Sequence, residues 1–149
     1  MDNDVERTDG TRADEKWGAA INPGFQILPD ALVRGQHLLK LSPTDLNVIL
    51  NLNQAWWYSD RLPFIRPHTI AKRMNVSERT VQRSLSRMRQ RGLLSLVRDT
   101  RPDGSVLYKH DLSGLQNKVE QLARRDMAYK DQELGVQRSQ YASVDSDQI

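Results

Sequence analysis

The residues best suited to chemistry lie between Asn75 and Leu94, in the stretch NVSERTVQRSLSRMRQRGLL, which contains five arginines and one acidic residue. At 100° per residue, one face of a helix here would carry side chains that bind bases and phosphates. These are Arg79, Gln82, Arg83, Ser86 and Gln90, flanked by Thr80 and Arg87. Arginine and glutamine pair with guanine and adenine edges in the major groove, and further arginines neutralise phosphates. The stretch therefore predicts recognition of nucleic acid.

The charge of the chain is distributed unevenly. The net charge of the 149 residues is +3, but residues 61–101 contain 11 lysines and arginines against two acidic residues, a net charge of +9. Residues 1–18 hold six acidic and three basic residues, a net charge of −3. A basic segment between acidic ends indicates a polyanionic partner, most often nucleic acid. A solvated arginine-rich face without a ligand is the alternative.

Two helices joined by a tight turn must position this polar face. Pro67 suits the start of the first helix, and Asn75 tolerates the left-handed conformation that ends it. Ser77 is a natural N-cap for the second helix, and Gly92 suits its C-terminal end. The apolar stripe of the second helix comprises Val81, Leu85 and Met88.

Further elements are predicted on both sides of this helix pair. An earlier helix begins after Ser42, with Pro43 in its first position and Asp45 near its positive end. After the pair, LLSLVRDTRPDGSVLYKHDL predicts two strands around a turn, in which Gly104 can take a positive φ. The predicted fold class is mainly α with a small β-hairpin.

The pattern A-x-x-x-N-V-S-x-x-T-V-x-R-x-L resembles the helix-turn-helix of winged-helix DNA-binding domains. The matching residues are Ala71, Asn75, Val76, Ser77, Thr80, Val81, Arg83 and Leu85, followed by Gly92, Leu93 and Leu94. The segment LSPTDLNVILNL resembles the first helix of bacterial, plasmid and phage winged-helix proteins, which include transcriptional regulators and replication initiators. The resemblance covers about residues 25–112. It departs from the family at Asn75, where glycine is usual, and at Arg66, where serine or threonine is a common cap.

The resemblance implies a recognition helix in the major groove and a hairpin, the wing, whose tip reaches phosphates or the minor groove. The DNA-binding residues then expected are Arg66, Ser77, Arg79, Thr80, Gln82, Arg83, Arg87, Arg98, Arg101 and Lys109. Asp99 and Asp103 argue against phosphate contacts by this hairpin, and the alternative interpretation is a surface hairpin without a ligand. Glu78 is unfavourable near DNA unless it accepts from a cytosine amine or holds a neighbouring arginine.

Beyond the hairpin, apolar residues recur at spacings of three and four, as in coiled coils. They are Leu112, Leu115, Val119 and Leu122. Packing on the same domain would explain this spacing, but a dimerisation helix is preferred, because paired recognition helices would read paired half-sites. The expected organisation is a disordered acidic N-terminus at 1–20, a winged helix-turn-helix domain at 21–111, a C-terminal helix at 112–135 and a disordered tail at 136–149.

The chain offers little for catalysis or for metal binding. It has no cysteine, and His37, His68 and His110 are not spaced as metal ligands. Phosphate-binding glycine loops and nucleophile elbows are also missing. No enzyme activity, cofactor, metal or small-molecule effector is therefore expected. Without a signal-peptide pattern or a bilayer-length apolar run, we expect a cytoplasmic, nucleoid-associated bacterial protein that does not contact membranes.

Three functions are compatible with the sequence. The first is a sequence-specific regulator of transcription that binds double-stranded DNA as a homodimer, most simply a repressor acting by occlusion. The second is a plasmid or phage replication or partition factor that binds repeated origin sites. The third is a winged helix that binds a partner protein, against which the net charge of +9 at residues 61–101 argues.

Overall fold

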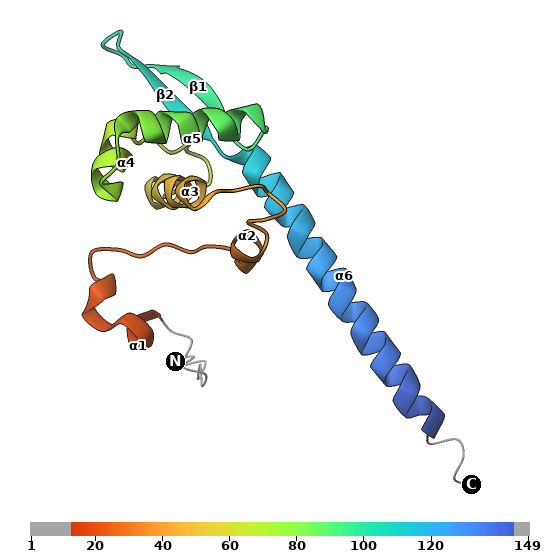
Figure 1. Cartoon of the computed structure of the whole chain (residues 1–149). Helices are drawn as coiled ribbons and strands as arrows, with labels where there is room; N and C mark the ends of the chain where they lie inside the picture. Colours follow the sequence, from red (N-terminus) through yellow and green to blue (C-terminus); the bar gives the residue numbers. More distant parts are fainter. Residues whose placement is uncertain (1–12, 145–149) are drawn as a thin grey trace.

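The computed structural model of the protein describes residues 13–144. In chain order its elements are α1 Ala13–Trp17, the 3-10 helix η1 Gly18–Ile21, α2 Asp30–Arg34, α3 Pro43–Ala55, α4 Pro67–Met74, α5 Glu78–Gln90, β1 Ser95–Thr100, β2 Val106–Asp111 and α6 Ser113–Val144. Helices α3, α4 and α5 pack together, the hairpin projects beside α5, and α6 leaves the body as one long helix (Figure 1). The prediction of a mainly helical chain with a small antiparallel hairpin is confirmed.

The ends of the chain differ from the predicted organisation. Residues 13–20, predicted to be disordered, lie in α1 and η1. Residues 136–144, predicted to be a disordered tail, continue α6. A polar composition favours disorder, but alanine, glutamate, lysine and glutamine are also good helix formers, and this local preference favours the helices. Residues 1–12 and 145–149 lie outside the described part of the chain.

Helix α3 begins as predicted. The Ser42 hydroxyl accepts a hydrogen bond from the backbone N–H of Asp45, and the Asp45 carboxylate accepts one from the N–H of Ser42, both at 3.1 Å. With Pro43 in the first helical position, this reciprocal arrangement satisfies N–H groups that a helix start leaves unpaired. The helix buries Val48, Ile49 and Leu52 in the core.

Helices α4 and α5 meet at a tight turn, also as predicted. Asn75 ends α4 in the left-handed conformation with φ 54°. The Ser77 hydroxyl accepts from the backbone N–H of Thr80 at 3.1 Å and so caps α5. Ala71 is buried where the two helices pack closely. The buried stripe of α5 consists of Val81, Leu85 and Met88, together with Ser84.

The hairpin follows α5 directly. Strands β1 and β2 are antiparallel, with Ser95 opposite Asp111 at the base and Thr100 opposite Val106 near the tip. Gly104 takes a φ of +83° in the turn, as predicted. The hairpin therefore stands beside α5 with a fixed register, which decides which of its side chains share a face.

The residues predicted to form a dimer seam pack on their own chain. Leu112, Leu115 and Val119 are buried in the core, and Leu122 packs against it. Helix α6 lies against α2, where Leu122 is close to Gly35. Spacings of three and four predict an apolar helix face but not which chain covers it. Here the same domain covers it, so these four residues do not form a free seam.

Gly114 allows α6 to start against the end of α5. A Cβ atom on this residue would lie 2.0 Å from the carbonyl oxygen of Gly92. We expect Gly114→Ala to lower the free energy of unfolding by about 1–3 kcal/mol, because the backbone would have to move. Urea denaturation measures this change. The control is Asn117→Ala, at an exposed position of the same helix, with an expected change below about 0.5 kcal/mol. Equal effects would contradict the close approach.

Candidate nucleic-acid interface

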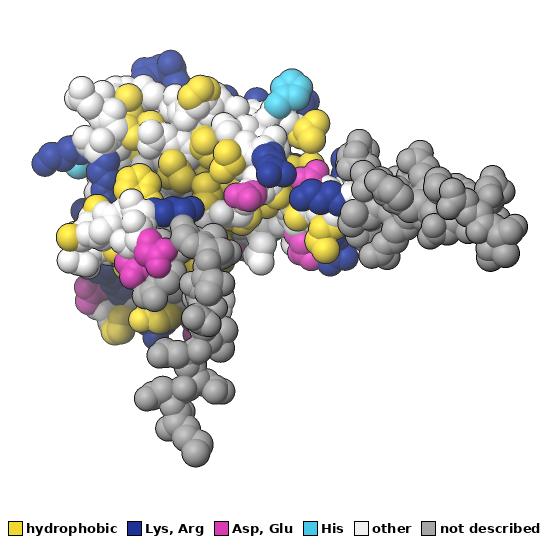
Figure 2. Space-filling view, turned by 90° about the horizontal axis from the view of Figure 1, so that it is seen from below, with side chains coloured by type: hydrophobic (Ala, Val, Ile, Leu, Met, Phe, Trp, Pro, Cys, Tyr) yellow, Lys and Arg dark blue, Asp and Glu magenta, His cyan; other side chains and the backbone are white. Residues whose placement is uncertain are grey.

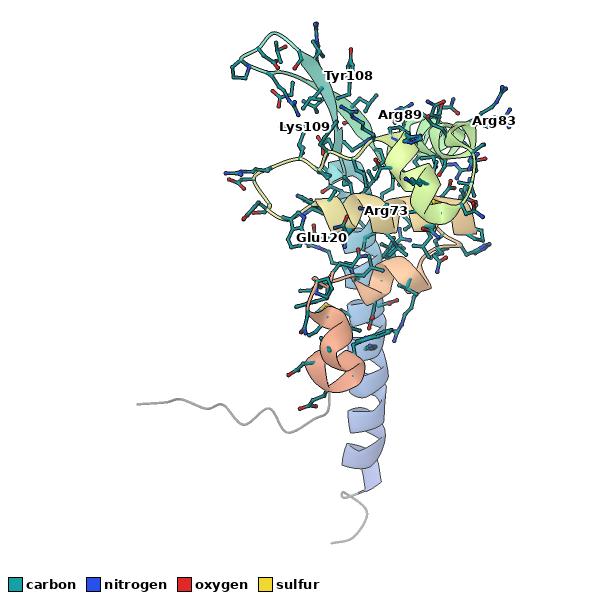
Figure 3. The ribbon with its side chains drawn as sticks, turned by 90° about the vertical axis from the view of Figure 1, so that its left-hand side faces the viewer. Arg73, Arg83, Arg89, Tyr108, Lys109 and Glu120 are labelled. Carbon is teal, nitrogen blue, oxygen red and sulfur yellow. The ribbon has the colours of Figure 1, made fainter. Side chains whose placement is uncertain are left out.

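Helix α5 presents the predicted polar face to solvent. Arg79, Gln82, Arg83 and Gln90 are exposed, and Ser86 is half-buried. The buried stripe on the other side of the helix fixes its rotation, and Arg83 extends away from the body of the domain (Figure 3). Within residues 13–144, the guanidinium groups of Arg79 and Arg83 form no hydrogen bond or ion pair. Both groups are therefore available to a partner.

Ser77 and Thr80, both predicted to contact DNA, are engaged at the start of α5. Their hydroxyl groups lie 2.9 Å apart and share a hydrogen bond, in addition to the capping bond. The contacts of Glu78 bear on one of its two alternatives, the pairing with a neighbouring arginine. Its carboxylate accepts from the amide of Gln82 at 3.3 Å and lies 3.8 Å from Nδ1 of His68, so it does not hold an arginine.

Arg87, another predicted DNA contact, points into the domain instead. Its Nη2 atom donates to Oδ1 of Asp45 at 2.9 Å, and Ser84 Oγ donates to the same oxygen at 2.6 Å. Arg91 lies 4.0 Å from the other carboxylate oxygen and donates to the carbonyl of Lys40. Asp45 is only 1% exposed. Asp45 therefore engages part of the Arg87 guanidinium group, whose side chain is 42% exposed, and the DNA contact of Arg87 stays a prediction.

The electrostatics of Asp45 support this ion pair. Burial raises the pKa of its carboxyl group, but hydrogen bonds from Ser84, the backbone of Ser42 and Arg87 together lower it more. The net result is a pKa below the ordinary 3.8. Asp45 is therefore ionised at neutral pH, and it holds α5 to α3 through a charge-assisted contact.

The basic residues of the hairpin are not equally available. Arg98 and Arg101 are exposed, whereas Lys109 Nζ lies 2.7 Å from Oδ2 of Asp99 in an ion pair. The register places Arg98 opposite Tyr108, so these two share one face of the hairpin and Lys109 lies on the other. Arg98 and Arg101 thus remain candidates for phosphate contacts, and Lys109 is already paired.

Sequence reasoning missed Arg89. Its half-buried side chain lies on the side of α5 that faces the hairpin, where a groove of about 530 Å³ separates the two elements. The side chains that line this groove include Phe64, Arg66, Gln82, Arg89, Tyr108 and His110. Arg89 follows Gln82 by seven residues, two helical turns, so the spacing places both on one side of α5. This spacing does not predict where the hairpin lies, so the sequence alone does not show that Arg89 lines a groove.

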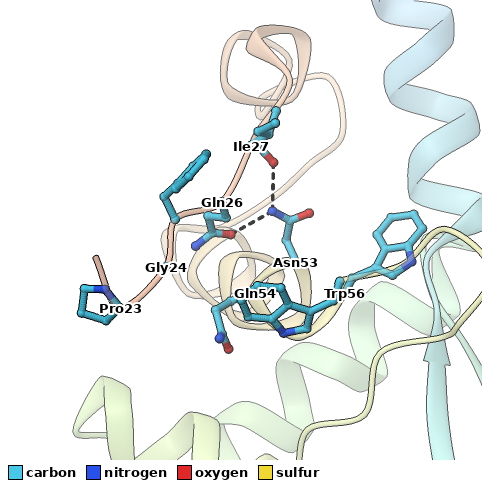
Figure 4. Close-up of a pocket in the computed structure, with 9 residues that line it drawn as sticks. Pro23, Gly24, Gln26, Ile27, Asn53, Gln54 and Trp56 are labelled. Atoms are coloured by element: carbon cyan, nitrogen blue, oxygen red, sulfur yellow. Dashed lines mark hydrogen bonds between the residues drawn. The ribbon is translucent and has the colours of Figure 1, made fainter. Parts of the chain in front are cut away.

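The side of the molecule below α3 in Figure 1 carries exposed apolar side chains. Residues 23–27 run along the end of α3, where Asn53 donates to the side chain of Gln26 at 2.8 Å and to the carbonyl of Ile27 at 3.0 Å (Figure 4). Seen from below, apolar side chains gather in the middle of the face, with lysine and arginine side chains beside and around them (Figure 2). Phe25, Ile27 and Trp57 are exposed. We therefore assign the candidate nucleic-acid interface to the other side, with α5 and the hairpin.

In the part of the chain that the structure describes, histidine and acidic side chains do not gather in groups of three that could hold a metal ion. Across residues 13–144, none of the helices is both long enough and apolar enough to span a membrane.

Comparisons with known proteins cover this region. A family model described as the DnaD N-terminal domain matches residues 28–130. The crystal structure of the N-terminal domain of the DnaD protein from Geobacillus kaustophilus HTA426 is similar, with 21% sequence identity and a TM-score of 0.55 over 79% of this chain and 96% of that chain. At that identity the likeness bears on the fold alone.

A second solved structure, a possible transcriptional regulator from Methanosarcina mazei Go1, has 22% identity and a TM-score of 0.40. The alignment covers 66% of this chain and 81% of that chain. This likeness is too weak to support an argument. Among curated proteins, none matches the chain.

Proposed function

Because the chain belongs to the DnaD N-terminal domain family, we propose that it binds double-stranded DNA in a process associated with replication. The observation that carries this proposal is the outward face of α5. Arg79, Gln82, Arg83 and Gln90 are exposed there, and the two arginines have no partner among residues 13–144. The role is one of binding, without catalysis or a cofactor.

In this proposal, α4, α5 and the hairpin act as a winged helix-turn-helix. Helix α5, with 13 residues, enters the major groove, which is about 12 Å wide and admits a helix. Arg79, Gln82 and Arg83 pair with base edges, for which arginine and glutamine are suited. Arg66, Arg98 and Arg101 are exposed and neutralise phosphates beside the groove. A protein-interaction role would not require this set of exposed arginines.

The same duplex contact would serve a repressor of transcription that acts by occlusion. Family membership favours replication, and the arrangement of sites distinguishes the two roles. Repeated sites near an origin would support replication, and a single palindrome over a promoter would support repression. In both cases a homodimer would read paired half-sites, through an interface other than the buried residues Leu112, Leu115 and Val119.

The test is selection of bound duplexes from a random pool, with sequencing, at two salt concentrations. We expect enrichment of one motif, and binding that weakens as salt rises because counterions are released from phosphates. Light scattering of the same preparation, free and bound, gives the number of copies on the site. Salt-sensitive binding without enrichment would contradict sequence-specific reading, and no binding at either salt would contradict the DNA-binding function.

Arg101→Ala tests the wing. Arg101 is exposed near the hairpin tip, which Asp103 closes by accepting from the N–H and hydroxyl of Ser105 at 2.9 and 2.6 Å. We expect equal weakening for all duplexes and a decrease of about one in the slope of log affinity against log salt. Lys109→Ala is the matched control, since Asp99 already pairs with that ammonium group. A slope that falls for Lys109→Ala but not for Arg101→Ala would exclude this wing contact.

A further inference from the structure

The groove between α5 and the hairpin lies beside the outward face of α5. Helix α5 contributes Gln82 and Arg89 to its lining, and the hairpin contributes Leu96 and Tyr108. Arg89 and Tyr108 lie on these two neighbouring elements (Figure 3). The volume of about 530 Å³ falls in the range of sites that bind small organic molecules. The groove is therefore large enough for one nucleotide unit.

The lining combines aromatic surface with positive charge. Phe64 is half-buried and Tyr108 is 55% exposed, so both can present ring surface to a ligand. Arg66 and Arg89 supply two cations, and the described lining contains no aspartate or glutamate. Neither guanidinium group forms a hydrogen bond or ion pair with a residue that the structure describes. A ligand that matches this lining has a flat apolar part and an anionic part.

His110 adds a buried polar group to the lining. It is 4% exposed, and its Nδ1 atom has no hydrogen-bond partner in the described part of the chain. A buried polar atom without a partner is unfavourable, so a hydrogen bond from a bound group would stabilise it. Burial lowers the pKa of His110, and the nearby charge of Arg89 lowers it further. The imidazole is therefore neutral at pH 7 and suits a neutral polar edge.

We propose that this groove binds an unpaired nucleotide of a DNA strand. The base lies against the aromatic side formed by Phe64 and Tyr108, with a polar edge on Nδ1 of His110, and the phosphate lies near Arg66 or Arg89. Stacking on aromatic rings accepts every base, so this contact has little sequence preference. A groove open to solvent lets a strand continue in both directions, whereas a free nucleotide is better held in an enclosed pocket.

The groove overlaps the proposed duplex-binding surface at Gln82 and Arg66, but Arg79 and Arg83 are not among the residues that line it. Variants of Arg79 and Arg83 therefore test the duplex contact without changing the lining of the groove. The two contacts can fail independently, because loss of duplex selection with retained binding of a single strand would affect only the proposal for α5.

Fluorescence anisotropy with the full chain and a labelled oligothymidylate of about eight nucleotides tests the groove. Tyr108→Ala and Arg89→Gln are each expected to weaken single-strand binding by about tenfold, through lost stacking and a lost phosphate contact. Arg125→Gln, at an exposed position of α6 outside the groove, is the control for the loss of one charge. This variant should change the affinity for the single strand by less than about twofold. Unchanged single-strand affinity in both groove variants would overturn the proposal.

Cross-linking locates the contact without relying on a variant. A strand that contains 5-iodouracil is irradiated with the protein, and the modified peptides are mapped. We expect adducts in residues 64–66 or 106–110, and adducts confined to α6 would overturn the proposal. Thymidine monophosphate serves as the competitor. Thymidine monophosphate should displace the labelled strand only at a much higher concentration than an unlabelled strand does. If both competitors acted at the same concentration, the occupant of the groove would be a free nucleotide, and the proposal of a strand would be overturned.

Discussion

Replacing Arg79 and Arg83 together with alanine is expected to lower the affinity for the selected duplex by about 2–6 kcal/mol. Each arginine that reads a base contributes about 1–3 kcal/mol, and the two lie one turn apart on the exposed side of α5. Neither side chain contacts another described residue through a polar group, so the loss reflects the interface and not the fold. Titration of a labelled duplex measures it, and Arg83→Ala alone should also relax discrimination at one base position.

The matched control is the removal of two arginines elsewhere. Arg124 and Arg125 are exposed on α6, away from α5 and the hairpin, and Arg124 pairs with Glu120 at 2.6 Å. Their double replacement removes the same charge, and we expect a loss of less than about 1 kcal/mol, mainly through long-range electrostatics. If the two double variants bound equally weakly, the effect would be one of net charge, and α5 would not be the reading helix.

The local parts of the fold could be predicted from the sequence because their signals are local. The Ser42 and Ser77 caps, the left-handed Asn75 and the glycine at the hairpin turn each depend on backbone preferences within a few residues. The buried stripe of α5 follows from helical spacing. These features also determine the exposed face of α5, which is why the exposure of Arg79 and Arg83 could be predicted.

Contacts between distant segments could not be predicted in this way. Arg87 stood on the polar side of α5 in the helical projection, but its partner Asp45 lies 42 residues earlier. The place of Asp45 near the positive end of α3 was predicted, but its contact with Arg87 depends on how α3 packs on α5. Arg89 and His110 were likewise joined only by the placement of the hairpin. Spacing specifies which residues share a face, and tertiary packing decides what that face meets.

Asp45→Ala is expected to lower the free energy of unfolding by about 2–4 kcal/mol. Alanine would leave the fully buried Ser84 hydroxyl without its partner at 2.6 Å and would remove the charge that Arg87 neutralises at 2.9 Å. The Arg87 side chain is 42% exposed, so water can solvate it, which keeps the loss below that of a fully buried pair. Urea denaturation measures the difference. The control variant Asp60→Ala removes an exposed acidic side chain and is expected to change the free energy of unfolding by less than about 0.5 kcal/mol.

The same carboxylate gives the stability a defined pH dependence. Its pKa is lower in the folded chain than the ordinary 3.8, so the unfolded chain binds the proton more readily. The stabilisation by Asp45 is therefore complete well above pH 3.8 and decreases as the pH falls through the lower folded pKa. The difference in free energy of unfolding between the wild type and Asp45→Asn should shrink over this acid range. A difference that stays constant would mean that ionised Asp45 does not hold α5 to α3, and the orientation of the reading face would then need another cause.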